Sequence, residues 1–256
     1  MTTLAVIGGT GTNQIPGFES TGHSLPDTPF GPTSGPLLEG TLSGHRCFFL
    51  ARHGTPHHLA PHRINYRANL WALHAVGAEQ VIGINAVGGI EPLLVPGEVV
   101  IPDQVVDYTW GRAHTYFDGS GQGFAPEALE HVDFTEPYDR EMRRQLVQLA
   151  ELEGLSFSAS GTLAVTQGPR LESAAEIRRL RNDGCDVVGM TGMPEAALAR
   201  ELGLRYASIC LVVNPAAGLS DALITLESMQ SALAKGADLV QRLLNAYLRA
   251  EVGPPG

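Results

Sequence analysis

Short apolar runs that end in glycine or in a small polar turn recur along this chain. Runs of this kind, bounded by turn residues, are typical of buried strands in an α/β sheet. They cover residues 4–8, 46–51, 81–87, 160–167, 186–188 and 204–213. Ligands of open α/β sheets bind beyond such strand ends. The pattern therefore predicts one sheet whose strand tips surround one pocket.

Apolar positions with helical spacing lie between these runs. They predict helices over 65–76, 138–152, 192–202 and 226–249, and another that begins near 174. Residues 24–44 are rich in Pro and Gly and predict an ordered loop that leads into a hairpin. Residues 97–102 and 104–107 are further strand candidates. No repeat or linker divides the chain, so we expect a single α/β domain over residues 1–256, with a central mixed twisted β-sheet flanked by α-helices.

The stretch from Asp186 to Gly203 reads as a strand, a small turn and an amphipathic helix. Thr191 or Gly192 is placed to cap the helix, and Pro194 suits a first turn where a missing N–H costs nothing. A helix start directs positive partial charge and free N–H groups at an anion or a sugar hydroxyl. We therefore expect a ligand at this turn.

Two other strand ends carry groups suited to phosphate. The glycine turn at Gly8–Gly11 contains Thr10, and its spacing does not fit a dinucleotide site because Gln14 stands where a third glycine belongs. Arg52 and His53 follow the strand 46–51, and arginine offers a planar fork of donors for phosphate. Zinc is disfavoured here, because the neighbouring histidines lack ligand spacing and an accompanying carboxylate.

Composition narrows the partners. The chain has 256 residues, 43% apolar and 17% charged, with a formal charge of −10, which argues against nucleic acid or an acidic membrane as a partner. No apolar run is long enough to cross a bilayer, and the N-terminus reads as a first strand and not as a signal peptide. Cys47, Cys185 and Cys210 lack paired spacing and predict reduced core residues. We expect a cytoplasmic protein.

Six motifs taken in order resemble the trimeric purine nucleoside phosphorylases, which include the methylthioadenosine and methylthioinosine phosphorylases. The motifs are Gly8–Gly11, Ala51–Gly54, Asn65–Asn69, Asn85–Gly89, Gly168–Arg170 and Gly189–Glu195. The resemblance implies the nucleoside phosphorylase fold and a phosphorolysis in which phosphate attacks the sugar C1′ and a purine leaves. It implies no metal and no organic cofactor, with inorganic phosphate as co-substrate. It also implies a homotrimer, and leaves open whether two trimers pair.

Carried over by position, the resemblance implies two groups of site residues. The phosphate site comprises Thr10, Arg52, His53, Asn85, Ala86 and Thr191. The nucleoside site comprises Ala86, Val87, Gly88, Leu171, Glu172, Met190, Asn214 and Ala216, with Met190 against the ribose. His131 resembles a residue that such trimers lend to a neighbouring pocket. Leu171 stands where the family usually has Phe, so we expect less ring stacking.

Three positions bear on which base is cleaved. Family members that cleave adenine nucleosides have Asp at the positions of Asn214 and Ala216 and Ser at that of Glu172, and this chain departs at all three. A carboxylate at Glu172 accepts from N1–H of a 6-oxopurine, and the Asn214 amide donates to O6 or N7 as charge grows on the leaving base. We expect Asn214, Glu172 and His53 to be catalytic, and hypoxanthine or guanine to be favoured over adenine.

The substituent at the sugar 5′ carbon is less constrained. Leu219, Leu223, Ile224 and Leu226 follow Asn214 and offer an apolar surface for a methylthio group, or they only seat the last helix. The preferred interpretation is phosphorolysis of S-methyl-5′-thioinosine. The alternatives are general inosine or guanosine phosphorolysis, methylthioadenosine phosphorolysis and a non-catalytic nucleoside-binding protein.

Overall fold

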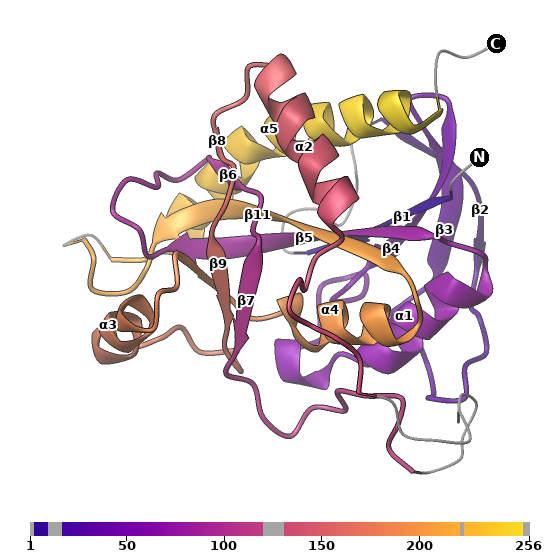
Figure 1. The fold of residues 1–256 in the computed structure, drawn as a ribbon, viewed down its shortest axis with the longest axis horizontal. Helices are drawn as coiled ribbons and strands as arrows, with labels where there is room; N and C mark the ends of the chain where they lie inside the picture. The colour runs from indigo at the N-terminus through magenta and orange to yellow at the C-terminus, as the bar shows by residue number, and fades with distance from the viewer. Residues whose placement is uncertain (1–2, 10–16, 120–130, 221–222, 253–256) are drawn as a thin grey trace.

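A mixed sheet of eleven strands organises the part of the chain that the structure describes. This computed structural model describes residues 3–9, 17–119, 131–220 and 223–252. The two longest strands, β5 (Gln80–Gly89) and β11 (Arg205–Pro215), pair in parallel at the centre of the sheet (Figure 1). Both are apolar along most of their length, as expected of strands covered on both faces. The expected α/β class with a mixed sheet is confirmed.

The edge of β5 opposite β11 changes partner midway along the strand. β1 (Leu4–Gly8) runs parallel to β5 and pairs with residues 80–83, while β10 (Val187–Gly189) runs antiparallel and pairs with Gly88 and Gly89. The carboxyl ends of β1 and β10 therefore face each other across residues 84–87 of β5. Open α/β sheets bind ligands at such switch points, because the adjacent strand ends leave a crevice.

The remaining strands extend the sheet on both sides. Next to β1 lies β4 (His45–Ala51), which runs parallel to it. β3 (Leu37–Leu42) then pairs antiparallel with β4, and β2 (Phe18–Ser24) pairs antiparallel with β3. Next to β10 lie β9 (Thr162–Val165) and β7 (Gln104–Asp107), both parallel to it. The short strand β6 (Val99–Val100) pairs antiparallel with β11, and β8 (Phe157–Ser158) pairs parallel with β6. The hairpin expected after the Pro-rich loop is the β3–β4 pair, and β2 was not anticipated.

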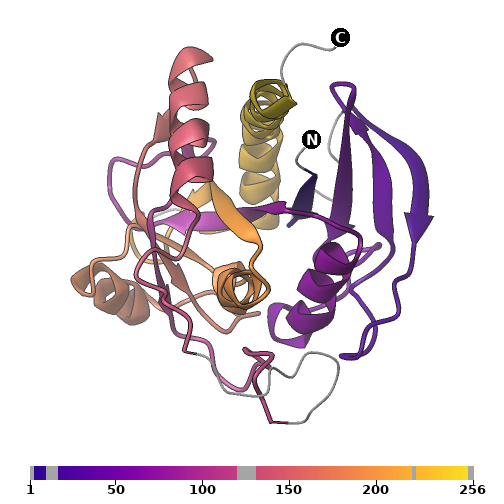
Figure 2. The same ribbon diagram turned by 45° about the vertical axis from the view of Figure 1, so that its right-hand side comes forward.

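Helices cover both faces of the sheet. α2 (Arg140–Leu152) and α5 (Leu226–Val252) lie on one side of β5 and β11, and α1 (Tyr66–Ala75) and α4 (Gly192–Glu201) lie on the other (Figure 1). α3 (Ala174–Asn182) and the short 3-10 helix Pro61–Arg63 lie at the periphery. Figure 2, in which the view is turned, shows the same two layers around the sheet. None of these helices combines the length and apolar composition that crossing a bilayer requires.

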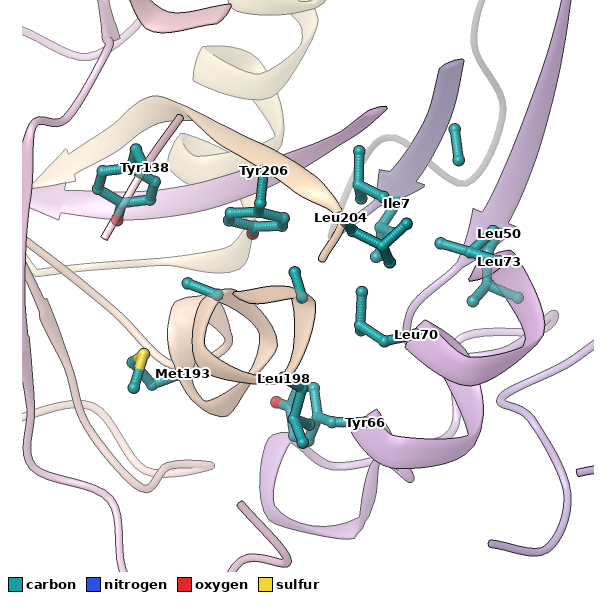
Figure 3. Packing of buried hydrophobic residues seen from close by; sticks show 14 of the residues in the cluster. Ile7, Leu50, Tyr66, Leu70, Leu73, Tyr138, Met193, Leu198, Leu204 and Tyr206 are labelled. Atoms are coloured by element: carbon teal, nitrogen blue, oxygen red, sulfur yellow. The ribbon is translucent and has the colours of Figure 1, made fainter. Parts of the chain in front are cut away.

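Alternating residues of β5 divide the core between these two layers. Val81 and Val87 face the cluster shared with α1 and α4, whereas Ile82 and Ile84 face the cluster shared with α2 and α5. Figure 3 shows the first cluster, where Leu70 of α1 and Leu198 of α4 lie between the two helices. Burying a side chain of this kind contributes roughly 1.5–3 kcal/mol. The long strand is thus held from both faces, which fixes the crevice at its edge.

Candidate functional site

A cavity of about 190 Å³ lies at the point where β5 changes partner. Its walls come from the ends of β1, β5, β10 and β11, from the segment after β4, from the segment before α3 and from the start of α5. The lining residues are Gly9, His53, Pro61, Ala86, Val87, Gly88, Pro169, Leu171, Gly189, Met190, Thr191, Val213, Asn214 and Met229. None of these described lining residues carries a carboxylate, an ammonium or a guanidinium group. The cavity is therefore walled by apolar, amide, hydroxyl and imidazole groups.

The structure brings most of the predicted site residues to this cavity. Those that line it are His53, Ala86, Val87, Gly88, Leu171, Met190, Thr191 and Asn214. Five others lie elsewhere, namely Arg52, Asn85, Glu172, Ala216 and His131, while Thr10 lies outside the described residues. The residues that meet here come from positions up to 161 apart in the chain, so their convergence follows from the sheet topology.

His53 is held in a defined tautomer. Its Nδ1 lies 2.8 Å from the Leu59 carbonyl oxygen, and its ring stacks on His57 with 4.2 Å between centroids. Because a carbonyl only accepts, Nδ1 carries the proton and Nε2 of the neutral ring is an acceptor. Burial is the main cause that lowers the pKa of His53 to about 4; the Leu59 hydrogen bond opposes it, and the Arg52 and His57 charges act in the same direction as burial. The ring is thus neutral at physiological pH.

The depressed pKa of His53 predicts a stability loss in acid. The unfolded chain binds a proton near pH 6.5 and the folded chain only near pH 4, so the contribution of this group is complete above pH 6.5 and is lost as pH falls towards 4. We expect His53 to account for about 2 kcal/mol of the free energy of unfolding lost between about pH 7.5 and about pH 5. Urea denaturation of the wild type and of His53→Gln at both pH values measures this difference. Equal losses in the two proteins would contradict it.

Thr191, which with Gly192 was one of two residues expected to cap α4, stands at the N-cap position, but its side chain makes no capping hydrogen bond. Its hydroxyl donates to the Asn85 side-chain oxygen at 2.7 Å, and the Asn85 amide in turn donates to the Ser208 hydroxyl at 2.8 Å. Met193 interrupts the first turn with extended backbone angles, so the regular helix begins beyond it. Asn85 is buried behind Thr191 and does not line the cavity. Its place in the structure is that of a support for the Thr191 hydroxyl.

A β-bulge orients Asn214. The register between β11 and β5 shifts between Val212 and Asn214, which places Asn214 opposite Gly88. A bulge adds one residue to a strand and so redirects a side chain out of the regular alternation. A Cβ on Gly88 would lie 3.3 Å from Nδ2 of Asn214, and that nitrogen donates to the Pro215 carbonyl at 2.7 Å. The Asn214 amide therefore sits directly at the Gly88 end of the cavity.

The phosphate-binding role predicted for Arg52 is corrected by the structure, in which its side chain does not line the cavity. Its side chain is fully buried, its Nε and Nη2 each donate to the Glu195 carboxylate at 2.8 Å, and its Nη1 donates to the Ile84 carbonyl at 2.7 Å. The two guanidinium N–H groups that were predicted to bind phosphate thus donate to Glu195 instead. Burial alone would lower the pKa of the Arg52 guanidinium, but the adjacent carboxylate raises it above its ordinary value. The cation lies behind the cavity wall and does not line it.

Glu172 also lies apart from its predicted partner. Its carboxylate accepts from the Thr166 hydroxyl at 2.6 Å and lines a second cavity of about 310 Å³, which Gly168 and Arg170 also line. Leu171, between them, lines the first cavity with Asn214. The segment before α3 is thus a wall with alternate side chains on its two sides. Glu172 and Asn214, predicted to bind one purine together, thus line two different cavities.

The apolar side of the cavity differs from expectation in its residues. Val213, Met229, Pro61 and Leu171 supply it. Three residues predicted for this surface, Leu219, Leu223 and Ile224, do not line the cavity, and Leu219 and Leu223 are 37% and 86% exposed. The side chain of Leu226, the fourth, lies outside the described part of the structure. Ala216 is buried against Gly88 behind the lining, and His131 is exposed away from it. Among the described residues, no group of three His, Cys, Asp or Glu side chains is arranged to hold a metal ion.

Arg112 was missed by the sequence reasoning. This largely buried side chain donates to the carbonyls of Gln167 and Met190 at 3.0 Å, and to that of Met193 at 2.6 Å. It therefore ties the segment before α3 to the segment before α4, and both segments line the cavity. Nothing in its local sequence, a polar stretch after β7, distinguishes it from a surface arginine.

Comparisons with known proteins agree on one family. A model of the Phosphorylase superfamily matches residues 3–249. The probable S-methyl-5′-thioinosine phosphorylase of Pseudomonas syringae pv. tomato is 51% identical over 251 residues, covering 98% of this chain and 100% of the relative. The 6-oxopurine nucleoside phosphorylase of Pyrococcus furiosus is 43% identical over 250 residues, covering 96% of this chain and 92% of the relative.

A solved structure shares the whole fold. Methylthioadenosine phosphorylase from Schistosoma mansoni, in complex with adenine, superposes with a TM-score of 0.90 at 30% sequence identity. The match covers 100% of this chain and 93% of that one. The relatives thus include proteins named for 6-oxopurine and for adenine nucleosides.

Proposed function

The chain belongs to the phosphorylase superfamily, and from this premise we propose that it cleaves the N-glycosidic bond of S-methyl-5′-thioinosine with inorganic phosphate. The products are hypoxanthine and 5-methylthioribose 1-phosphate. The proposed reaction needs no metal or organic cofactor, because phosphate is itself the nucleophile and the sugar supplies the electrophilic carbon. The enzyme is accordingly a pentosyltransferase of the nucleoside phosphorylase type.

One observation carries the proposal. A single cavity at the switch point of the sheet has His53 and Thr191 beside the β1 end of β5, and Asn214 beside Gly88 further along the same strand. Successive residues of a strand rise about 3.3 Å, so the three steps from Asn85 to Gly88 span about 10 Å. This separation suits a phosphate at one end and a purine at the other, with the sugar between them.

The phosphate is proposed to lie between His53 and Thr191. In the neutral His53 ring, Nε2 accepts a hydrogen bond from a protonated phosphate oxygen. Gly9 lacks a side chain, so the end of β1 presents only backbone to the nucleophile. Holding phosphate beneath C1′ converts a bimolecular displacement into an effectively unimolecular step.

The leaving purine is proposed to lie against Asn214. As the bond from C1′ to the purine nitrogen breaks, its electron pair passes to the base, and a phosphate oxygen forms the new bond to C1′. A donor aimed at the base stabilises the negative charge that develops there. The Asn214 amide can donate to O6 or N7 of hypoxanthine. Donation to O6 is the basis for preferring a 6-oxopurine, because the 6-amino group of adenine is itself a donor, whereas N7 is an acceptor in both bases.

The 5′ end is proposed to meet the apolar side of the cavity. Met229, Val213 and Leu171 offer no partner for a hydroxyl, whereas a methylthio group gains about 0.8 kcal/mol for each buried methylene equivalent. Methylthioadenosine is the second candidate substrate, because Glu172 does not line the cavity that Asn214 lines, so the carboxylate expected to disfavour adenine is not among its walls. Inosine or guanosine would leave a 5′-hydroxyl against these apolar side chains.

Assembly and location belong to the same proposal. A homotrimer, with or without pairing of two trimers, would let His131 reach a neighbouring cavity, and the exposed position of His131 away from its own cavity supports this. The three cysteines are buried free thiols, in keeping with a proposed cytoplasmic location.

Release of free hypoxanthine from S-methyl-5′-thioinosine, with phosphate present and with phosphate removed, tests the proposed reaction. We expect stoichiometric hypoxanthine and 5-methylthioribose 1-phosphate only when phosphate is present. A non-catalytic nucleoside-binding protein would retain the nucleoside intact in both conditions. Release of free methylthioribose without phosphate would indicate a hydrolase and would refute the phosphorolysis.

A further inference from the structure

A buried group of four hydrogen-bonded residues lies directly behind the proposed phosphate site, namely Arg52, Ile84, Glu195 and Tyr206. Glu195 is fully buried and accepts from both the Arg52 fork and the Tyr206 hydroxyl, each at 2.8 Å. Arg52 also donates to the Ile84 carbonyl. Space around Glu195 is tight, since a Cβ on Gly83 would lie 2.8 Å from its Oε1. The carboxylate therefore has a fixed position with all its contacts internal.

This group adjoins the cavity on two sides. Nη1 of Arg52 would lie 2.9 Å from a Cβ on Gly9, and Arg52 directly precedes His53 in the chain. Glu195 follows Thr191 by four residues and lies near the start of α4. Gly9, His53 and Thr191 all line the cavity. The ion pair is thus packed against the residues proposed to hold phosphate.

Glu195 matters for the phosphate site because its negative charge offsets the positive charge of Arg52. The described lining of the cavity has no charged side chain; Arg52 places a positive group directly behind Gly9 of that lining, and Glu195 offsets its charge. A guanidinium without this partner would attract phosphate and the sugar phosphate product alike. Tighter binding of both ground states does not accelerate the chemical step.

We propose that Glu195 is a positioning residue that sets the charge of the phosphate site, by holding the Arg52 fork inside the wall and offsetting its charge. The inference rests on the proposed function, since it concerns the same phosphate. It assigns Glu195 a role in the affinity for phosphate, beyond its contribution to stability. Removing its charge while keeping its shape should therefore tighten phosphate binding even as the fold loses stability.

Two substitutions separate charge from packing. Glu195→Gln keeps the side-chain length and removes the negative charge. Glu195→Asp keeps the negative charge and shortens the side chain by one methylene group. Calorimetric titration with inorganic phosphate should give a dissociation constant about tenfold lower for Glu195→Gln than for the wild type. Glu195→Asp should stay near the wild-type value. Both variants should show a lower Tm without phosphate, and phosphate should raise the Tm of Glu195→Gln by more than that of the wild type.

Glu201→Gln is the matched control. Glu201 lies at the other end of α4 and accepts from the Thr115 hydroxyl and the Tyr116 amide, away from the cavity. This control should lose stability with no change in phosphate affinity. Unchanged or weaker phosphate binding by Glu195→Gln would overturn the inference, as would insolubility both with and without phosphate. Solubility of Glu195→Gln only with phosphate would support it. Absence of phosphate binding by the wild type would instead defeat the proposed function, and this inference with it.

Discussion

Replacement of Asn214 by alanine is expected to lower kcat for S-methyl-5′-thioinosine by about 10² to 10³-fold. The β-bulge after Val212 places this amide at the Gly88 end of the cavity, where the purine is proposed to lie. The donor acts on charge that develops only as the glycosidic bond breaks, so its removal affects kcat more than KM. Steady-state rates at saturating phosphate measure the effect.

Asn69→Ala provides the control for this substitution. Asn69 is a fully buried amide that accepts from the Ser34 backbone at 2.9 Å, outside the cavity lining. It should lower stability by about 1–3 kcal/mol while kcat stays within a few-fold of the wild type. If Asn214→Ala keeps wild-type kcat, or if Asn69→Ala loses as much, Asn214 does not stabilise the leaving base.

Replacement of Arg52 by leucine is expected to lower the free energy of unfolding by about 3–5 kcal/mol. The substitution leaves the Glu195 carboxylate buried without its bidentate partner, and it frees the Ile84 carbonyl. Breaking a buried ion pair from one side is costly because the remaining charge lacks both water and a counter-ion. Urea denaturation at neutral pH gives the loss directly.

Arg46→Leu is the matched surface substitution. Arg46 pairs with Glu39 at 2.8 Å, but the two side chains are 60% and 43% exposed, so solvent screens their interaction. A change within about 1 kcal/mol is expected there. Comparable losses in both variants would mean that the buried pair contributes no more than an exposed one.

Local patterns made most of the elements predictable from the sequence. The helix expected over 65–76 corresponds to α1. Its start follows from the local sequence, since the Asn65 side chain caps the helix by accepting from the Ala68 amide. The helix expected from 174 is α3, which a capping box between Ser173 and Glu176 begins. β2 escaped prediction because it is an edge strand whose residues are mostly exposed and show no apolar alternation.

Side-chain partners across the fold could not be read from the sequence. Arg52 was assigned to phosphate by its place at a strand end, but Glu195, 143 residues further along, takes its fork. Thr191 or Gly192 was expected to cap a helix; Thr191 stands at the N-cap position, but its hydroxyl donates to Asn85 and not to the helix. Strand ends indicated which residues gather at the switch point. Which of them face the cavity depends on long-range contacts that no local pattern encodes.

The central claim is tested most directly by kcat/KM for S-methyl-5′-thioinosine, S-methyl-5′-thioadenosine and inosine, measured side by side at one phosphate concentration. We predict the highest value for S-methyl-5′-thioinosine, because Asn214 favours a 6-oxopurine and Met229 and Val213 favour a methylthio group. Comparable turnover of inosine would refute only the methylthio preference. A higher value for S-methyl-5′-thioadenosine would contradict the account of base recognition.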